Sequence, residues 1–186
     1  MTANTWFAEL RAMFGRLYGD KFDHTENMQD LEDAIKYARE ELNKTPSDDP
    51  NVAIILIKLG YHLSNRYDRM GNMQDLEDAI QHTQAAVNTT PSGHPDLPGR
   101  LINLGNRLSK RYNRMGNMQD LQDAIKHTEA AVNKTPPGHP NLSAVLNNLG
   151  TILSHRYTRM GNMQDLQDAI RHTQAAVNKA PCGHPD

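Results

Sequence analysis

The pentapeptide Asn-Met-Gln-Asp-Leu occurs four times in the chain, at residues 27–31, 72–76, 117–121 and 162–166. Consecutive copies start 45 residues apart, and the same spacing separates four glycines, Gly15, Gly60, Gly105 and Gly150. Four windows therefore cover all but six of the 186 residues, namely 6–50, 51–95, 96–140 and 141–185. A fixed period of this size is typical of repeat proteins, in which each unit packs on its neighbours. We interpret residues 1–186 as one array of four repeats.

Each window predicts two helices. In the third window apolar residues recur at steps of four, three, four and four, at Leu97, Leu101, Leu104, Leu108 and Tyr112. This spacing indicates one face of a helix. Gly116 is suited to end that helix, Asn117 to cap the next one, and Pro136 to follow its end. Three residues are N-cap candidates for the first helices: Asn51, Asp96 and Asn141. No segment alternates with the period of a strand, so the sequence predicts an all-α fold of helix pairs.

Composition excludes several classes of protein. Twenty basic and 22 acidic residues give a net charge of -2, which argues against a nucleic-acid partner. The longest apolar run, 52–57, is too short to span a bilayer, so we expect no membrane association. The single cysteine, Cys182, excludes an internal disulfide framework. We expect a cytoplasmic protein.

The helix pairs resemble the tetratricopeptide repeat (TPR), whose 34 residues follow the pattern W-x2-LG-x2-Y, A-x3-F and P. The third window matches it with Leu101-x2-Leu104-Gly105-x2-Leu108, then Ala124-x3-Thr128, then Pro136. Leu and Thr replace most of the aromatic residues of the pattern. The 45-residue length is similar to repeats of kinesin light chains, of fungal NLR-like receptors and of proteins with a CHAT-type protease domain. The resemblance implies a right-handed superhelix whose first helices line a concave groove.

In this resemblance the groove binds a protein or peptide. Windows three and four differ at 13 of 45 positions, and eight of these lie on the first helix. A constant scaffold with a variable inner face suits recognition, although drift on a solvated face is the alternative interpretation. The residues expected to bind the partner are Arg16, Ile54, Ile57, Tyr61, Asn65, Gly99, Ile102, Asn106, Lys110, Asn147, Thr151 and His155.

Two other functions remain open. One is a self-assembling structural module, and the other is a regulatory array of a CHAT-type protease or an NLR-like receptor. The last helix keeps its apolar stripe without a polar substitution, so we expect self-association, as a homo-oligomer, through Leu166, Ile170 and Val177. Asp186 stands where another repeat would begin, which favours a fragment of a longer array.

No motif predicts an enzyme, a metal site or a cofactor. The nine histidines form no pair with the spacing of zinc ligands, and we expect them to pack in turns or to hydrogen-bond helix ends. Arg66 and its copies are expected to form a solvated ladder of ion pairs with Asp75, Asp78 and their copies. Met73, Met118 and Met163 are expected to fill the core.

Overall fold

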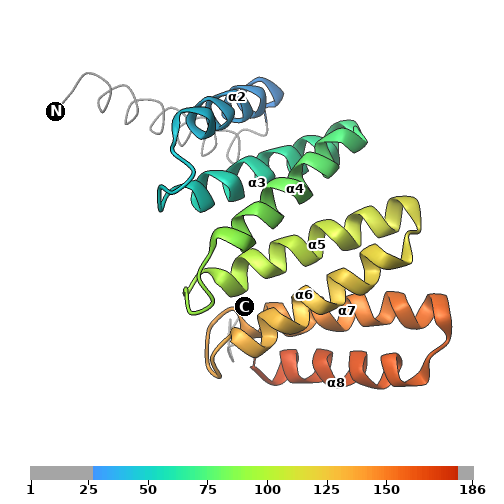
Figure 1. Ribbon diagram of the computed structural model, residues 1–186. Helices are drawn as coiled ribbons and strands as arrows, with labels where there is room; N and C mark the ends of the chain where they lie inside the picture. The colour runs from blue at the N-terminus through green and yellow to red at the C-terminus, as the bar shows by residue number, and fades with distance from the viewer. Residues whose placement is uncertain (1–26, 180–186) are drawn as a thin grey trace, which may run out of the picture. The chain divides into compact units, whose positions relative to one another are not determined.

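The computed structural model describes residues 27–179, and within that range it contains seven helices and no strand (Figure 1). They are α2 (Met28–Lys44), α3 (Val52–Met70), α4 (Met73–Thr89), α5 (Leu97–Met115), α6 (Met118–Lys134), α7 (Leu142–Met160) and α8 (Met163–Lys179). The second to fourth windows each form one complete pair of helices, and α2 is the second helix of the first window. The predicted all-α helix-pair fold is confirmed.

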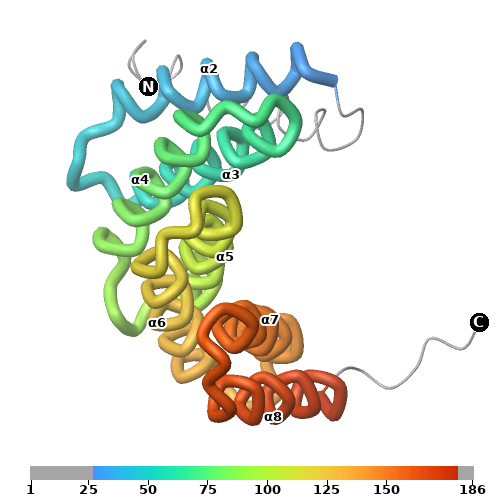
Figure 2. The backbone as a smooth tube through the Cα atoms, turned by 90° about the vertical axis from the view of Figure 1, so that its right-hand side faces the viewer, coloured from blue at the N-terminus to red at the C-terminus, as the bar shows by residue number. Residues whose placement is uncertain are grey.

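The chain divides into two compact units, Met1–Thr90 and Pro91–Asp186. In the first unit α3 packs against both α2 and α4. In the second unit α5 pairs with α6, α7 pairs with α8, and α7 also packs on α6 (Figure 2). Each pair is antiparallel because only two residues separate its helices.

The turn inside each pair has the two capping residues that the sequence predicts. Gly116 ends α5 with a left-handed φ of 73°, and its N–H donates to the Tyr112 carbonyl at 2.7 Å. Glycine adopts this conformation without steric cost. Asn117 then starts α6, where its side-chain oxygen accepts from the Gln119 N–H at 3.0 Å. Both features recur in the other complete pairs.

The predicted caps of the first helices are wrong in mechanism. Asn51, Asp96 and Asn141 do precede α3, α5 and α7, but none makes a side-chain capping bond. Their backbone is already helical, with φ between -84° and -81°, whereas a capping side chain needs an extended backbone. The N–H groups of Asp96 and Asn141 instead donate to the Nδ1 atoms of His94 and His139, both at 3.1 Å. These two histidines therefore bind a helix end, as expected.

Small residues let the two helices of a pair approach closely. A Cβ atom added at Gly105 would overlap Thr128 Oγ1 and lie 3.2 Å from the Ala124 carbonyl oxygen. Gly150 has the equivalent neighbours, Thr173 and Ala169. The threonine hydroxyl is itself satisfied, because Thr128 Oγ1 donates to the Ala124 carbonyl at 2.8 Å. The backbones of α5 and α6 therefore approach closely at Gly105.

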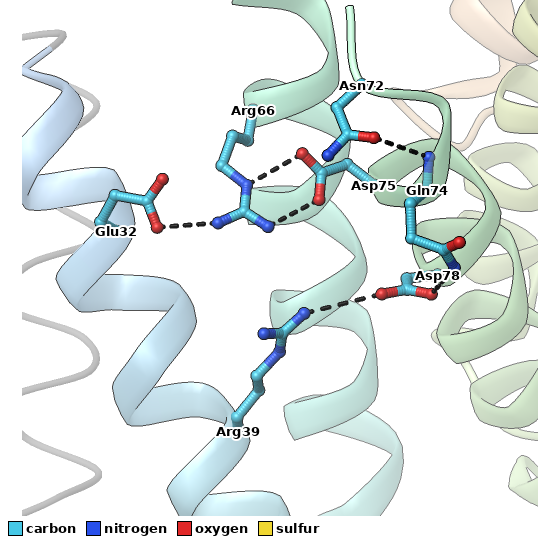
Figure 3. A network of polar contacts seen from close by, with 7 residues as sticks. All are labelled: Glu32, Arg39, Arg66, Asn72, Gln74, Asp75 and Asp78. Carbon is cyan, nitrogen blue, oxygen red and sulfur yellow. Dashed lines mark hydrogen bonds and ion pairs between the residues drawn. The ribbon is translucent and has the colours of Figure 1, made fainter. Parts of the chain in front are cut away.

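A bidentate ion pair connects the two helices of each complete helix pair. Arg66 Nε and Nη2 donate to the two carboxylate oxygens of Asp75 at 2.9 and 2.6 Å (Figure 3). Asp75 is only 2% exposed, so the expected solvated ladder is wrong at this position. The same bonds join Arg111 to Asp120 and Arg156 to Asp165. The bonds to Asp75 and Asp165 raise the pKa of Arg66 and Arg156.

Candidate functional site

The candidate partner-binding residues of α3 lie on one exposed face. Ile54 and Tyr61 are 43% and 42% exposed, and Ile57 and Asn65 are half-buried. The residue after Ile54, Ile55, is buried. Because these four residues recur at steps of three and four, they share one face of the helix. Ile57 on this face also packs against the core cluster that contains Val52 and Leu56. Two large apolar side chains thus meet solvent there.

The corresponding residues of α5 are more polar. Gly99 and Asn106 are exposed, whereas Ile102 and Lys110 are half-buried. A Cβ atom at Gly99 would have no neighbour within 4 Å, which places this position at an open surface. The equivalent positions of α5 are therefore also exposed or half-buried, but their side chains are more polar than those of α3.

On α7 the candidate residues line a groove that sequence reasoning did not foresee. Asn147 and Thr151 are exposed and His155 is half-buried. They border a groove of about 470 Å³ between α7 and α8, to which Leu166, Ile170 and Val177 also contribute. The structure therefore brings the expected partner-binding residues of α7 together with the expected self-association residues of α8.

The self-association residues differ in exposure. Ile170 and Val177 are 61% and 64% exposed, whereas Leu166 is half-buried. Ser154 and Thr173 also line the groove and are exposed. Their copies in the preceding pair, Ser109 and Thr128, are buried, so the sequence alone gives no signal for them.

The candidate residues fall into both units. Ile54, Ile57, Tyr61 and Asn65 belong to the first unit, and those of α5 and α7 to the second. Arg16 lies outside the described residues.

Arg107, next to Asn106, is a buried charged residue that the sequence analysis did not single out. Its side chain is buried, and its Nε atom has no hydrogen-bond partner among the described residues. Desolvation lowers the pKa of Arg107 to about 10. The same position holds His62 in α3 and Ile152 in α7, both buried. A position that is apolar in one copy and charged in another was the available signal.

The histidines of the second helices are half-buried. Burial lowers the pKa values of His82, His127 and His172 below the usual histidine value. In residues 27–179 no group of three or more His, Cys, Asp or Glu side chains has the arrangement of a metal site. Cys182 lies outside that range.

The expected role of the methionines needs a correction. Met73 and Met118 are half-buried, but Met163 is 56% exposed and does not fill the core. Each of the described first helices also ends with an exposed methionine that the sequence analysis did not single out: Met70, Met115 and Met160. None of the helices in the described part of the chain is both long and apolar enough to cross a membrane.

Comparison with known proteins finds similarity at the level of structure. No protein-family model matches the sequence, and no curated protein matches it. The structure is similar to the crystal structure of BtubC (BKLC) from P. vanneervenii, with a TM-score of 0.67, 17% identity, and coverage of 95% of this chain. The chain spans 66% of the length of BtubC.

Two further solved structures show the same likeness. The crystal structure of MamA has a TM-score of 0.54 and 17% identity, with coverage of 89% of this chain and 85% of MamA. The de novo designed helical repeat protein DHR64 has a TM-score of 0.50 and 14% identity, with coverage of 92% of each chain. At these identities the similarity establishes the fold alone. The fold of this chain is that of TPR-like helical repeat proteins.

Proposed function

We propose that the chain is a protein-interaction scaffold without catalytic activity, and that it binds a peptide or protein through the exposed faces of its first helices. Stacked helix pairs suit this role because they present extended surfaces on a rigid framework. The observation that carries the proposal is the exposure of Ile54 and Tyr61 beside the buried Ile55. Exposed tyrosines and isoleucines on a rigid helix can anchor a partner.

The variation between repeats supports selective binding. Each first helix has its own exposed residues: Ile54 and Tyr61 on α3, Asn106 on α5 and Thr151 on α7. The buried leucines beside them do not change, as Leu59, Leu104 and Leu149 illustrate. A surface that changes its chemistry over a constant core can bind one peptide sequence in preference to others.

A random peptide library displayed on phage provides a defined probe. Peptides are selected on the 186-residue chain and titrated against the triple variant Tyr61→Ala, Asn106→Ala, Lys110→Ala. We expect the affinity to fall at least about tenfold, because the variant removes an aromatic anchor and two polar contacts. Circular dichroism should show unchanged helical content, since none of the three side chains is fully buried.

The control replaces exposed apolar side chains that lie outside the proposed binding residues. Met70→Ala with Met115→Ala alters residues that are 65% and 63% exposed. Peptide binding should be retained by this double variant. Selected peptides that bind the triple variant as tightly as the unmodified chain would reject the proposed site.

A role within a larger receptor is the second candidate. The 45-residue period is the observation that favours it, since the resemblance to arrays of fungal NLR-like receptors and CHAT-associated proteins depends on that length. In such a protein the array would act as a sensor in the cytoplasm, a location that the single cysteine supports. Sequencing the coding region downstream of Asp186 tests this: an effector domain would support it, and its absence would reject it.

A further inference from the structure

The groove between α7 and α8 exposes a face of α8. In contrast, α7 packs against the nearly identical helix α6. The sequences of α6 and α8 differ at only two of 17 positions, Lys126/Arg171 and Glu129/Gln174. Ile125 on α6 is 4% exposed, whereas its copy Ile170 on α8 is 61% exposed. The difference arises because α7 packs on α6, and no described helix packs on α8 in that way. The exposed face of α8 therefore carries nearly the same residues as α6, on which α7 packs.

The contacts of α2 with α3 and of α6 with α7 show which residues a covering helix contributes. Leu31 and Ile35 of α2 form one apolar cluster with Leu59 and Leu63 of α3. Val132 of α6 packs against the cluster that contains Leu142 of α7. Leu42 of α2 packs in the same way against the cluster of Val52. The covering helix thus begins with an apolar residue at the position of Val52 and Leu142, and continues with two more at the positions of Leu59 and Leu63.

Residues 7–22 carry this pattern in the same 45-residue register. Phe7 corresponds to Val52 and Leu142, Phe14 to Leu59, and Tyr18 to Leu63. The position of Ile55 and Val145, both buried, is Leu10 in this segment. We propose that the α7–α8 groove binds the segment 7–22 of a second copy of this chain, so that copies associate head to tail. This assembly surface shares Asn147, Thr151 and His155 with the proposed peptide-binding residues and adds the exposed residues of α8.

Charge makes little contribution to the proposed contact. At the junction of α2 and α3, Glu32 pairs with Arg66 at 2.7 Å. The corresponding residues of the new contact are Gln167 on α8 and Lys21 on the second copy, which cannot form an ion pair. Burial of apolar side chains is then the main driving force, and raised salt should leave the association intact or strengthen it.

A head-to-tail contact uses two different surfaces, which gives it a distinctive assembly behaviour. A contact between different surfaces leaves one of each free and can continue, whereas a contact between two identical surfaces stops at a dimer. Sedimentation velocity of the 186-residue chain, from micromolar to near-millimolar concentration, should give a mass that rises from 20.9 kDa past that of a dimer. A mass that stays at 20.9 kDa would overturn the proposal.

The groove is tested by Ile170→Glu with Val177→Glu. Both side chains are already more than half exposed, so the fold should tolerate the change while the contact does not. Met115→Glu with Met160→Glu is the matched control, because these side chains are equally exposed and lie outside the groove. We expect the groove variant to remain a monomer and the control to associate. Unchanged association of the groove variant would overturn the proposal.

Cysteine cross-linking identifies the occupant. In a Cys182→Ser background, one preparation carries Phe7→Cys and another carries Val177→Cys. Because Val132 packs against the cluster of Leu142, these two cysteines should meet between copies. Oxidising the mixture should yield a cross-linked pair of unlike chains, and each preparation alone should yield little. Cross-linking of Val177→Cys to itself would show a tail-to-tail contact, and an absence of cross-links would remove residues 7–22 as the occupant; either result overturns the proposal.

The outcome can be distinguished from that of the peptide-binding test. The variants at Ile170 and Val177 leave Tyr61, Asn106 and Lys110 unchanged, so peptide binding by an unassociated chain remains measurable. Failure of assembly with retained peptide binding would reject only this inference.

Discussion

Arg111 and Asp120 join the two helices of the third repeat through two parallel hydrogen bonds, from Nη2 to Oδ1 at 2.6 Å and from Nε to Oδ2 at 2.9 Å. The aspartate side chain is 4% exposed, whereas the arginine side chain is 27% exposed. The pair lies across the turn that contains Gly116 and Asn117. This ion pair fixes how α5 and α6 are aligned along each other.

Removing the charge of the buried carboxylate should destabilise the fold. We expect Asp120→Asn to lower the free energy of unfolding by about 2 to 4 kcal/mol, since one bond of the pair is lost and the arginine keeps its charge near the core. Asp123→Asn is the control, because Asp123 accepts only an exposed bond from Gln119 at 3.2 Å. That change should cost less than about 0.5 kcal/mol. Urea denaturation measures both, and equal effects would contradict a special role for the buried pair.

Two glycines of α5 should respond to alanine with opposite signs. Gly105→Ala places a methyl group against Thr128 Oγ1 and the Ala124 carbonyl, so we expect a loss of about 1 to 3 kcal/mol. Gly99→Ala meets open space and should stabilise the helix by about 0.5 to 1 kcal/mol. Thermal unfolding distinguishes the two.

The double variant Gly105→Ala, Thr128→Ala isolates the contact with the hydroxyl. It should recover part of the lost stability, but not all, because the carbonyl oxygen of Ala124 remains 3.2 Å from the added Cβ. No recovery would place the clash in the backbone alone.

Replacing the buried arginine should stabilise the protein. Arg107→Ile inserts the residue that α7 carries at the same position, and Ile152 is 3% exposed there. We expect a gain of about 1 to 3 kcal/mol, since the change removes the desolvation cost of a buried charge. Arg114→Ile, at an exposed position of the same helix, should leave stability nearly unchanged. A loss of stability in Arg107→Ile would show that the guanidinium makes a favourable contact.

The half-buried histidines predict a stability that depends on pH. Burial lowers the pKa of His82, His127 and His172, so the unfolded chain binds more protons than the folded chain between the folded pKa and the usual value of about 6.5. Their contribution is complete above about pH 6.5 and is lost as the pH falls through the folded pKa. Thermal unfolding from pH 7.5 to pH 5 should show this decline.

The triple variant His82→Gln, His127→Gln, His172→Gln tests whether these histidines cause the pH dependence of stability. Its melting temperature should fall less between pH 7.5 and pH 5 than that of the unmodified chain. An equal fall in both would assign the pH dependence to other groups.

Much of the fold could be predicted from the sequence. The repeat register placed the helix pairs, and the Gly116-Asn117 turn formed as expected because its bonds are local. The prediction that the site residues of α3 share one face needed only the helical period. The mechanism at Asp96 could not be foreseen, since it depends on whether the backbone there is extended or helical.

The sequence by itself determined which segments are helices, where they turn and which residues share a face, because those properties depend on bonds between residues a few positions apart. Only the tertiary structure decided which faces are covered. Ile125 and Ile170 occupy the same position in nearly identical helices, yet one is buried and the other is open to solvent. Likewise, Asp120 is buried because α5 and α6 pack together. Burial is a relation between a residue and its neighbours, so two copies of one sequence differ whenever only one of them has a helix packed upon it.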